Sequence, residues 1–200
     1  MTKQTQPLER HPWPPFIPDN PRVMIMGSFP PQPHRRAMEF YYPNRTNDFW
    51  KMTGIIFYND PTRFYDPTSR QFDLPRIKAF LCERHIAMGD TGTAVVRLRD
   101  NASDKFLDIR ESIDIFALLD RYPTLTALVT TGEKAAGIIA EKTSTPVPAM
   151  GKCETFVHNG RTISHWRMPS TSRAYPLNIE KKADYYRLMF QAAGIYQQPK

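Results

Sequence analysis

The chain alternates between short apolar runs and longer segments in which apolar residues recur every three or four positions. A short apolar run bounded by turn residues is typical of a strand buried in the middle of a sheet. Runs of this kind predict strands at 23–26, 93–98 and 125–131. Nearer the C-terminus, the dipeptide Asn159-Gly160 predicts a tight hairpin. The hairpin would join two further strands, at 155–158 and 162–168.

The segments with a helical period lie mostly between these strands. We expect helices at 47–57, 75–85, 108–119, 133–141 and 178–193. Thr46 would cap the first of them, and Gly194 would end the last. Because strands alternate with helices, the predicted fold class is α/β, with a parallel sheet covered by helices on both faces.

The length of 200 residues suits one domain. We expect this domain at 22–196. The preceding residues, 1–21, are polar and rich in proline, and Trp13 and Phe16 are their candidate anchors. They are predicted to form an arm on the surface.

Ligands of parallel sheets bind beyond the carboxyl ends of the strands. Three segments leave those ends, at 27–30, 130–134 and 168–172. Gly27 would let the chain turn sharply out of its strand. Pro169 would stiffen a turn rich in hydroxyl donors that suit phosphate oxygens. Taken by itself each segment also fits an ordinary turn, so the prediction depends on their meeting at one edge.

The segment 40–50 combines five aromatic residues with two asparagines. Aromatic rings can sandwich a flat base, and an amide can read its polar edge or hold a water molecule. Packing in the core accounts for Phe49 and Trp50. It accounts less well for Tyr42 and Asn47, which come at the junction of loop and helix. We therefore treat Tyr42 and Asn47 as candidate functional residues.

The overall charge adds a weak preference for a polyanionic partner. The chain carries 27 Lys and Arg against 20 Asp and Glu, a formal net charge of +7. Such a balance favours nucleic acid through steering and counterion release. The pair Arg35-Arg36 is a candidate phosphate contact or plain surface charge, and Lys181-Lys182 is predicted to be a solvated helix face.

Other function classes are disfavoured. No apolar stretch approaches the roughly 18 residues of a membrane span. The N-terminus has no apolar signal-peptide core, so a cytoplasmic protein is expected. Cys82 and Cys153 cannot by themselves form a disulfide framework or ligate a metal, and the histidines lack metal-ligand spacing. Neither Gly-rich phosphate-binding motif is present. We expect no metal, no cofactor and no membrane partner.

Taken together, these motifs resemble the uracil-DNA glycosylase superfamily, most closely its hypoxanthine-DNA glycosylase branch. That branch has Gly-Ser-Phe-Pro after its first strand, matched here at 27–30. It has Phe-Tyr-Tyr, then an Asn, then Phe-Trp, matched without a gap at 40–42, Asn47 and 49–50. It has Leu-Pro-Ser-Thr-Ser in a late loop, matched by Met-Pro-Ser-Thr-Ser at 168–172. The order and spacing fit along about 150 residues.

The resemblance implies a three-layer α/β/α sandwich around a four-stranded parallel sheet. It implies a monofunctional glycosylase that flips a deaminated base, uracil or hypoxanthine, out of DNA and hydrolyses its N-glycosidic bond without metal or cofactor. Asn47 would orient the attacking water rather than take up its proton. Gly27, Ser28 and Phe29 would line the base pocket, and Tyr42 would stack on the base. The residues implied to contact DNA are Pro30, Lys134, Pro169, Ser170, Thr171, Ser172 and Arg173.

Four positions depart from the family pattern. Thr131 stands where an Asn that reads the base usually ends the third strand, so the identity of the base is open. Met168 replaces a His that stabilises the leaving base in better-known members, although the closest branch is also apolar there. Asp48 replaces an Arg. It would be either a second catalytic residue that activates water or a first-turn acid favoured by the helix dipole. The segment 173–175 replaces Pro-Ala-Asn.

Two other function classes stay open. A member of the fold that binds DNA without catalysis would explain Met168 and Thr131, and its binding would depend on salt. A hydrolase of another small N-riboside would use the same pocket and cleave free nucleosides. We expect a monomer whose partner is DNA with damaged or mismatched bases. The sequence does not fix the excised base or the strand preference.

Overall fold

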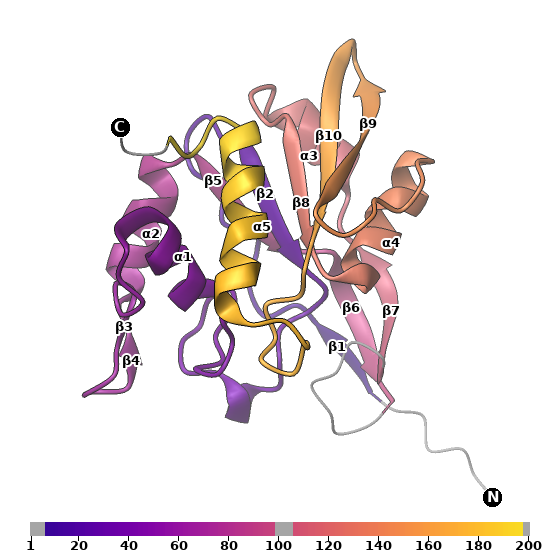
Figure 1. The fold of residues 1–200 in the computed structure, drawn as a ribbon. Helices are drawn as coiled ribbons and strands as arrows, with labels where there is room; N and C mark the ends of the chain where they lie inside the picture. Colours follow the sequence, from indigo (N-terminus) through magenta and orange to yellow (C-terminus); the bar gives the residue numbers. More distant parts are fainter. Residues whose placement is uncertain (1–6, 99–105, 198–200) are drawn as a thin grey trace, which may run out of the picture.

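The structure of the protein is a computed structural model that describes residues 7–98 and 106–197. Its centre is a five-stranded sheet in the order β5-β2-β8-β10-β9 (Figure 1). The strands are β5 (Ile86–Asp90), β2 (Val23–Gly27), β8 (Ala127–Thr131), β10 (Arg161–Met168) and β9 (Lys152–His158). The first four run parallel, and β9 pairs antiparallel with β10 through the predicted hairpin. The prediction of four parallel strands is therefore wrong in total strand number, because the hairpin adds an antiparallel edge strand.

Helices cover both faces of this sheet, as the α/β pattern predicts. One face carries α1 (Phe49–Tyr58), α2 (Leu74–Glu83) and α5 (Ile179–Ala192), and the other carries α3 (Ile115–Arg121) and α4 (Glu133–Thr143) (Figure 1). The two cores alternate along β2: Val23 and Ile25 belong to the first, and Met24 and Met26 to the second. Burial on both faces explains why β2 is a continuous apolar run.

A second sheet has three antiparallel strands in the order β1-β6-β7. Its strands are β1 (Leu8–Arg10), β6 (Gly92–Arg97) and β7 (Leu107–Ser112). The strand predicted at 93–98 thus exists, but it belongs to this sheet rather than to the central one.

The helix predicted at 108–119 is wrong in its first half, where β7 lies. Helix α3 begins only at Ile115, after Asp114 accepts a hydrogen bond from a backbone N–H of the first turn. Leu107 and Ile109 alternate along β7 and pack in one cluster with Phe29. This tertiary contact and the pairing with β6 override the helical spacing.

Strand β5 has no counterpart in the sequence prediction. It reads Ile-Ala-Met-Gly-Asp, and Ala and Gly weaken the strand signal. Only Arg84 and the left-handed His85, with φ 54°, separate it from the end of α2. Its last residue, Asp90, pairs in register with Gly27 of β2. β5 therefore brings a fourth carboxyl end to the edge where the sequence predicts three.

The described part of the predicted N-terminal arm packs on the domain. Strand β1 pairs with β6, Phe16 forms an isolated bridge with Met88, and both Trp13 and Phe16 contact the first core. Residues 1–6 of the arm lie outside the described residues. The remaining elements are β3 (Tyr65–Asp66), β4 (Gln71–Phe72) and the 3-10 helix η1 (Pro33–Arg35). Within the two described ranges, no helix is both long enough and apolar enough to cross a bilayer.

Candidate functional site

The carboxyl ends of β2, β8 and β10 open into one pocket of about 1180 Å³. Its walls come from the loops that follow these strands, from the end of β5 and from the segment 42–47. Thirteen of the fourteen candidate residues line it: Gly27, Ser28, Phe29, Pro30, Tyr42, Asn47, Thr131, Lys134, Pro169, Ser170, Thr171, Ser172 and Arg173. Stretches far apart in the sequence therefore meet at one edge of the sheet, as the motif order predicts.

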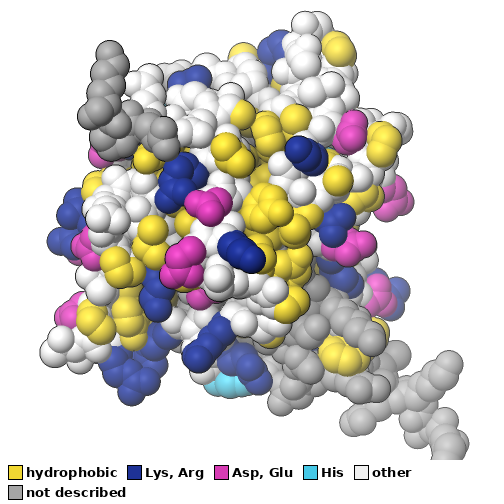
Figure 2. Space-filling model, viewed as in Figure 1, with side chains coloured by type: hydrophobic (Ala, Val, Ile, Leu, Met, Phe, Trp, Pro, Cys, Tyr) yellow, Lys and Arg dark blue, Asp and Glu magenta, His cyan; other side chains and the backbone are white. Residues whose placement is uncertain are grey.

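The pocket carries an excess of positive charge. Its basic lining residues are Arg35, Lys134, Arg167 and Arg173, and its acidic ones are Asp90 and Glu133. Figure 2 shows Lys and Arg side chains gathered along the lower edge, toward which the loops after β2 and β10 run in Figure 1. Of the predicted pair Arg35-Arg36, only Arg35 lines the pocket, because the Arg36 guanidinium donates to the Pro31 carbonyl and lies over the Trp13 ring.

Asn47 lies in the turn that leads into α1. Its Oδ1 accepts a hydrogen bond from the Phe49 N–H at 2.9 Å, and its own N–H donates to the Asn44 carbonyl at 2.9 Å. These bonds hold the amide at the pocket wall, where it can orient a small molecule. The cap predicted at Thr46 is wrong, because the Thr46 hydroxyl donates to Asn44 Oδ1 and α1 begins two residues later than expected.

Tyr42 is held on two sides. Its ring stacks on Phe49 with centroids 4.0 Å apart and planes 12° apart, and its hydroxyl lies 2.9 Å from Thr131 Oγ1. The backbone at Tyr42 is left-handed, with φ 52°, a conformation that side chains adopt only when the surroundings hold it. Phe49 covers one face of the Tyr42 ring, so stacking on a base would use the opposite face.

Gly27 ends β2 for a different reason from the one predicted. Its φ is not in the left-handed region, so a sharp exit from the strand does not require glycine. A Cβ built there would lie 2.7 Å from Asp90 Oδ1 and 3.6 Å from the Tyr42 hydroxyl. Glycine is required because the Asp90 carboxyl group approaches the backbone so closely. The next two residues, Ser28 and Phe29, are both buried.

The late loop after β10 is rich in hydroxyls and is held by several hydrogen bonds. The Pro169 carbonyl accepts from the buried Tyr186 hydroxyl at 3.0 Å. The hydroxyl oxygens of Ser170 and Ser172 accept from backbone N–H groups two residues further on, at 3.2 and 3.3 Å. Each bond uses the oxygen as acceptor, so the hydroxyl proton can still be donated. Ser172 and Arg173 are exposed at the rim.

Asp48 is the one candidate residue that does not line the pocket. Its Oδ2 accepts from Lys182 Nζ at 2.7 Å, and the same ammonium group donates to the Ser172 carbonyl at 2.9 Å. The Asp48 N–H donates to the Thr171 carbonyl at 2.9 Å. Lys182 and Asp48 thus fasten the start of α1 to the late loop.

The solvated helix face predicted at Lys181-Lys182 is wrong for Lys182, which is fully buried, and holds for Lys181, which is exposed. Lys182 shares a helix face with Tyr186 and Met189, four and seven residues further on. That spacing is visible in the sequence and indicates a buried position.

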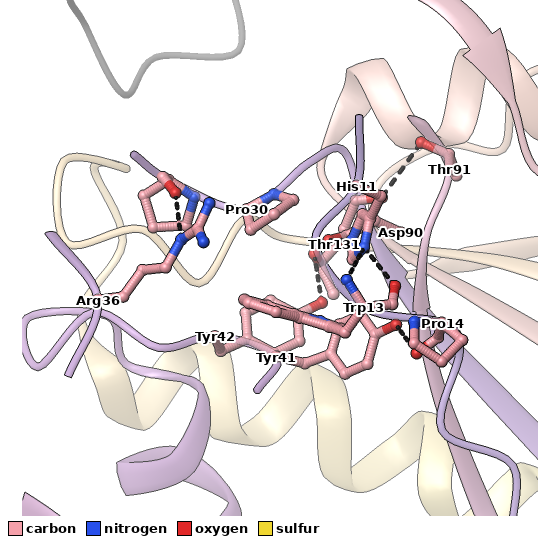
Figure 3. Close-up of polar contacts among 12 residues, drawn as sticks. His11, Trp13, Pro14, Pro30, Arg36, Tyr41, Tyr42, Asp90, Thr91 and Thr131 are labelled. Atoms are coloured by element: carbon pink, nitrogen blue, oxygen red, sulfur yellow. Dashed lines mark hydrogen bonds and ion pairs between the residues drawn. The ribbon is translucent and has the colours of Figure 1, made fainter. Parts of the chain in front are cut away.

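Two residues at the site are absent from the sequence prediction, Asp90 and His11. Figure 3 shows them side by side, with His11 Nε2 2.9 Å from Asp90 Oδ2 and each side chain 9% exposed. His11 Nδ1 lies 2.6 Å from the Trp13 carbonyl. Asp90 lines the pocket. Recognising β5 as a strand would have placed Asp90 at the same edge as Gly27. Among the described residues no group of three His, Cys, Asp or Glu side chains could hold a metal ion.

Comparisons with known proteins bear on the fold. No protein-family model matches the chain, and a search of curated proteins finds no match. The structure is similar to a solution NMR structure described as a "putative Uracil DNA glycosylase" from Methanosarcina acetivorans, with a TM-score of 0.61. The two sequences are 18% identical, and the match covers 94% of this chain and 99% of the other. The chain therefore shares the overall α/β fold of that structure.

Proposed function

We propose that the protein is a DNA glycosylase that hydrolyses the N-glycosidic bond of a deaminated base, uracil or hypoxanthine, flipped out of DNA. The observation that carries this proposal is the convergence of Ser28, Tyr42, Asn47 and Ser170 on one pocket at the carboxyl edge of the sheet. The similarity of the fold to a structure described as a "putative Uracil DNA glycosylase" supports it.

The size and charge of the pocket support a nucleic-acid ligand. At about 1180 Å³ it exceeds the roughly 300–1,000 Å³ typical of small-molecule sites, which leaves room for a nucleotide and its flanking phosphates. Arg173, Ser170 and Ser172 at the rim would contact phosphate oxygens, while Pro30 and Pro169 would press on the backbone. Lys134 already donates to the Leu107 carbonyl, and its ammonium group has further protons for a phosphate.

The reaction needs a leaving base and a positioned water. The bond between the base nitrogen and the sugar carbon breaks with its electron pair left on the base, and positive charge of oxocarbenium type builds on the sugar. The water oxygen then bonds to the same sugar carbon, and the proton that it loses goes to the departed base or to solvent. Asn47 would orient the water through its fixed amide, since an amide cannot take up the proton. The Ser28 and Thr131 donors would stabilise the departing base, a task that the buried Met168 side chain cannot perform.

A duplex panel tests the proposal. The protein is incubated with duplexes that carry uracil or hypoxanthine at one position, and abasic sites are then cleaved with alkali. We expect strand cleavage on at least one of them. Asn47→Ala should lower the single-turnover rate about tenfold or more without weakening binding to DNA.

Because Asn47 Oδ1 also accepts from the first N–H of α1, a matched control is needed. Asn178 is the N-cap of α5, with its Oδ1 accepting from the Lys181 N–H at 2.9 Å, and it does not line the pocket. Asn178→Ala should lower stability by about 1 kcal/mol and leave base release unchanged. Equal loss of base release in both variants would mean that Asn47 acts only by holding the start of its helix.

A second candidate function, DNA binding without catalysis, is favoured by two observations. Met168 is apolar, and the Asp48 carboxylate is bound by Lys182. This candidate predicts salt-dependent binding of damaged or single-stranded DNA with no base release on any duplex. Cleavage of free nucleosides without any action on DNA would instead indicate a small N-riboside hydrolase.

A further inference from the structure

Asp90 is the better buried of the two acidic residues that line the pocket. Its side chain is 9% exposed, whereas Glu133 is 80% exposed and pairs with Arg167. A carboxyl group enclosed beside a pocket for a polyanion repels the ligand unless it has a specific partner. A hydrogen bond from a neutral N–H group of the ligand to the Asp90 carboxyl group would avoid that repulsion.

The proton arrangement of the pair follows from the Trp13 carbonyl. His11 Nδ1 lies 2.6 Å from the Trp13 carbonyl and 3.3 Å from the Trp13 N–H, and the much shorter contact to the carbonyl, which only accepts, favours a proton on Nδ1. Nε2, at 2.9 Å from Asp90 Oδ2, is then either the second donor of an imidazolium or the acceptor of a proton on Oδ2. In both cases the proton shared by the two residues lies between Nε2 and Oδ2. The other oxygen, Oδ1, is an acceptor in either charge state.

Oδ1 is also the oxygen that approaches the candidate base site. It lies 2.7 Å from the point where a Gly27 Cβ would stand, and the Tyr42 hydroxyl lies 3.6 Å from the same point. The absence of a side chain at Gly27 leaves this acceptor beside the pocket rather than behind a methyl group. Tyr42 and Thr131 place their paired hydroxyls next to it (Figure 3).

We propose that Asp90 Oδ1 is a specificity-determining acceptor that reads the ring N–H of the flipped base, an inference that rests on the proposed function. Uracil and hypoxanthine both present a ring N–H next to a carbonyl on their Watson–Crick edge. Cytosine and adenine, from which deamination produces them, present a lone pair at the same ring position. An acceptor at this point attracts the deaminated base and repels its parent. Asp90 would also recognise the base in place of the Asn that the family pattern has where this chain has Thr131.

The experiment measures binding and base release separately. Duplexes with uracil, cytosine, hypoxanthine, adenine or an abasic-site analogue at one position are titrated against Asn47→Ala, which keeps the base in place. The same duplexes are titrated against Asn47→Ala combined with Asp90→Asn. Asp90→Asn is isosteric, and its amide can turn an N–H toward a ring lone pair. We expect the preference for the deaminated base over its parent to fall about tenfold or more, with binding to the abasic analogue changed no more than in the control.

Glu133→Gln is the matched control, because it removes a negative charge from the same pocket rim. It should raise affinity for all five duplexes alike and leave their ratios unchanged. A second test needs no substitution at Asp90. N3-methyluracil has no ring N–H, so the wild-type protein should bind it at least about tenfold more weakly than uracil. Asp90→Ala, which makes room for the methyl group, should shrink that difference.

The outcomes separate the two proposals. A wild-type preference for the deaminated base that survives Asp90→Asn unchanged overturns the role of Asp90, even if base release proves the glycosylase. Absence of any preference in the wild-type protein also overturns it. A binding preference for the deaminated base that depends on Asp90, found without base release, supports the proposed role of Asp90 and contradicts the proposed glycosylase activity.

Discussion

Two buried pairs of ionisable side chains flank the pocket, and they serve it in different ways. Lys182 and Asp48 lie 2.7 Å apart, with side chains 0% and 20% exposed, and their remaining bonds go to backbone groups of the late loop. His11 and Asp90 lie 2.9 Å apart and are equally enclosed, but the Asp90 carboxyl group lines the pocket. Both pairs are therefore enclosed by the fold, but only the second has a side chain that a ligand in the pocket could contact.

This difference teaches how to rank buried charges as functional candidates. A buried pair by itself indicates neither stability nor catalysis, because the desolvation of both ions offsets much of their attraction. A buried pair is a functional candidate when one of its side chains lines the pocket. Asp48 is next to Asn47 in the sequence and is a tempting water-activating base, yet its carboxylate faces an ammonium group. Asp90 is far from every recognised motif, yet it faces the pocket.

Removal of Lys182 should have the largest effect on stability. Lys182→Met leaves the Asp48 carboxylate without its ammonium partner and takes one of two donors from the Ser172 carbonyl, which keeps the Tyr175 N–H at 3.1 Å. We expect the free energy of unfolding to fall by about 3 kcal/mol or more, measured by urea denaturation at pH 7.5. Lys181→Met, at the exposed neighbouring position, is the control and should change little. Asp48→Asn added to Lys182→Met should recover part of the loss; stability equal to wild type in Lys182→Met alone would contradict the importance of the pair.

His165 sharpens the comparison, because it is a buried ionisable group with no charged partner in the described structure. Its Nε2 lies 3.1 Å from Thr130 Oγ1, and its buried Nδ1 finds no hydrogen-bond partner there. Burial lowers the pKa of His165 to about 4 from an ordinary value of 6.5. The folded protein therefore resists a proton that the unfolded chain accepts below pH 6.5, and stability falls as the pH drops from 6.5 toward 4.

We expect this residue to make the free energy of unfolding about 2 kcal/mol lower at pH 5 than at pH 7.5. The comparison is with His165→Gln, which retains a donor for Thr130 but does not titrate. The difference in pH dependence between the two proteins isolates His165 from the carboxylates. Identical slopes would show that His165 does not resist protonation.

His11→Phe tests whether the second pair acts on the ligand more than on the fold. We expect a loss of about 1–2 kcal/mol in the free energy of unfolding, smaller than for Lys182→Met, because water in the open pocket can solvate the Asp90 carboxylate. The preference for a deaminated base over its parent should fall together with this change. His34→Phe, at an exposed histidine on η1, should alter neither quantity. If His11→Phe costs as much stability as Lys182→Met and spares base preference, the two pairs do not differ in role.

The sequence predicts the parts of the fold in which a single local signal is strong. The buried run of β2, the Asn159-Gly160 hairpin and the long amphipathic α5 are each specified by neighbouring residues, and they are confirmed. The sequence does not predict β5 or β7. In β5, Ala87 and Gly89 weaken the strand signal. In the other, tertiary pairing defeats a helical spacing. The loss of β5 also hides Asp90.

The same limit applies to the site. The ordered motifs bring thirteen candidate residues to one pocket, because their positions follow from strand ends. The partners of charged residues depend on contacts more than a hundred positions apart, such as Asp48 with Lys182. No local pattern specifies such a contact. Only the helical face shared by Lys182 and Tyr186 gives a hint that the lysine is buried.

The smallest expected effect concerns Tyr42, which touches the pocket between the two pairs through both its ring and its hydroxyl. Tyr42→Phe removes the 2.9 Å bond to Thr131 and keeps the stack on Phe49, so we expect a loss of about 1 kcal/mol in the free energy of unfolding. Thr131→Val should cost a similar amount. The double variant should cost less than the sum, because both changes remove the same bond.

Base release should fall little in Tyr42→Phe and clearly more in Tyr42→Ala, because the ring rather than the hydroxyl would stack on the base. If Tyr42→Phe lowers the rate of base release clearly while the free energy of unfolding changes little, the Tyr42 hydroxyl also takes part in recognising the base, as we propose for Asp90.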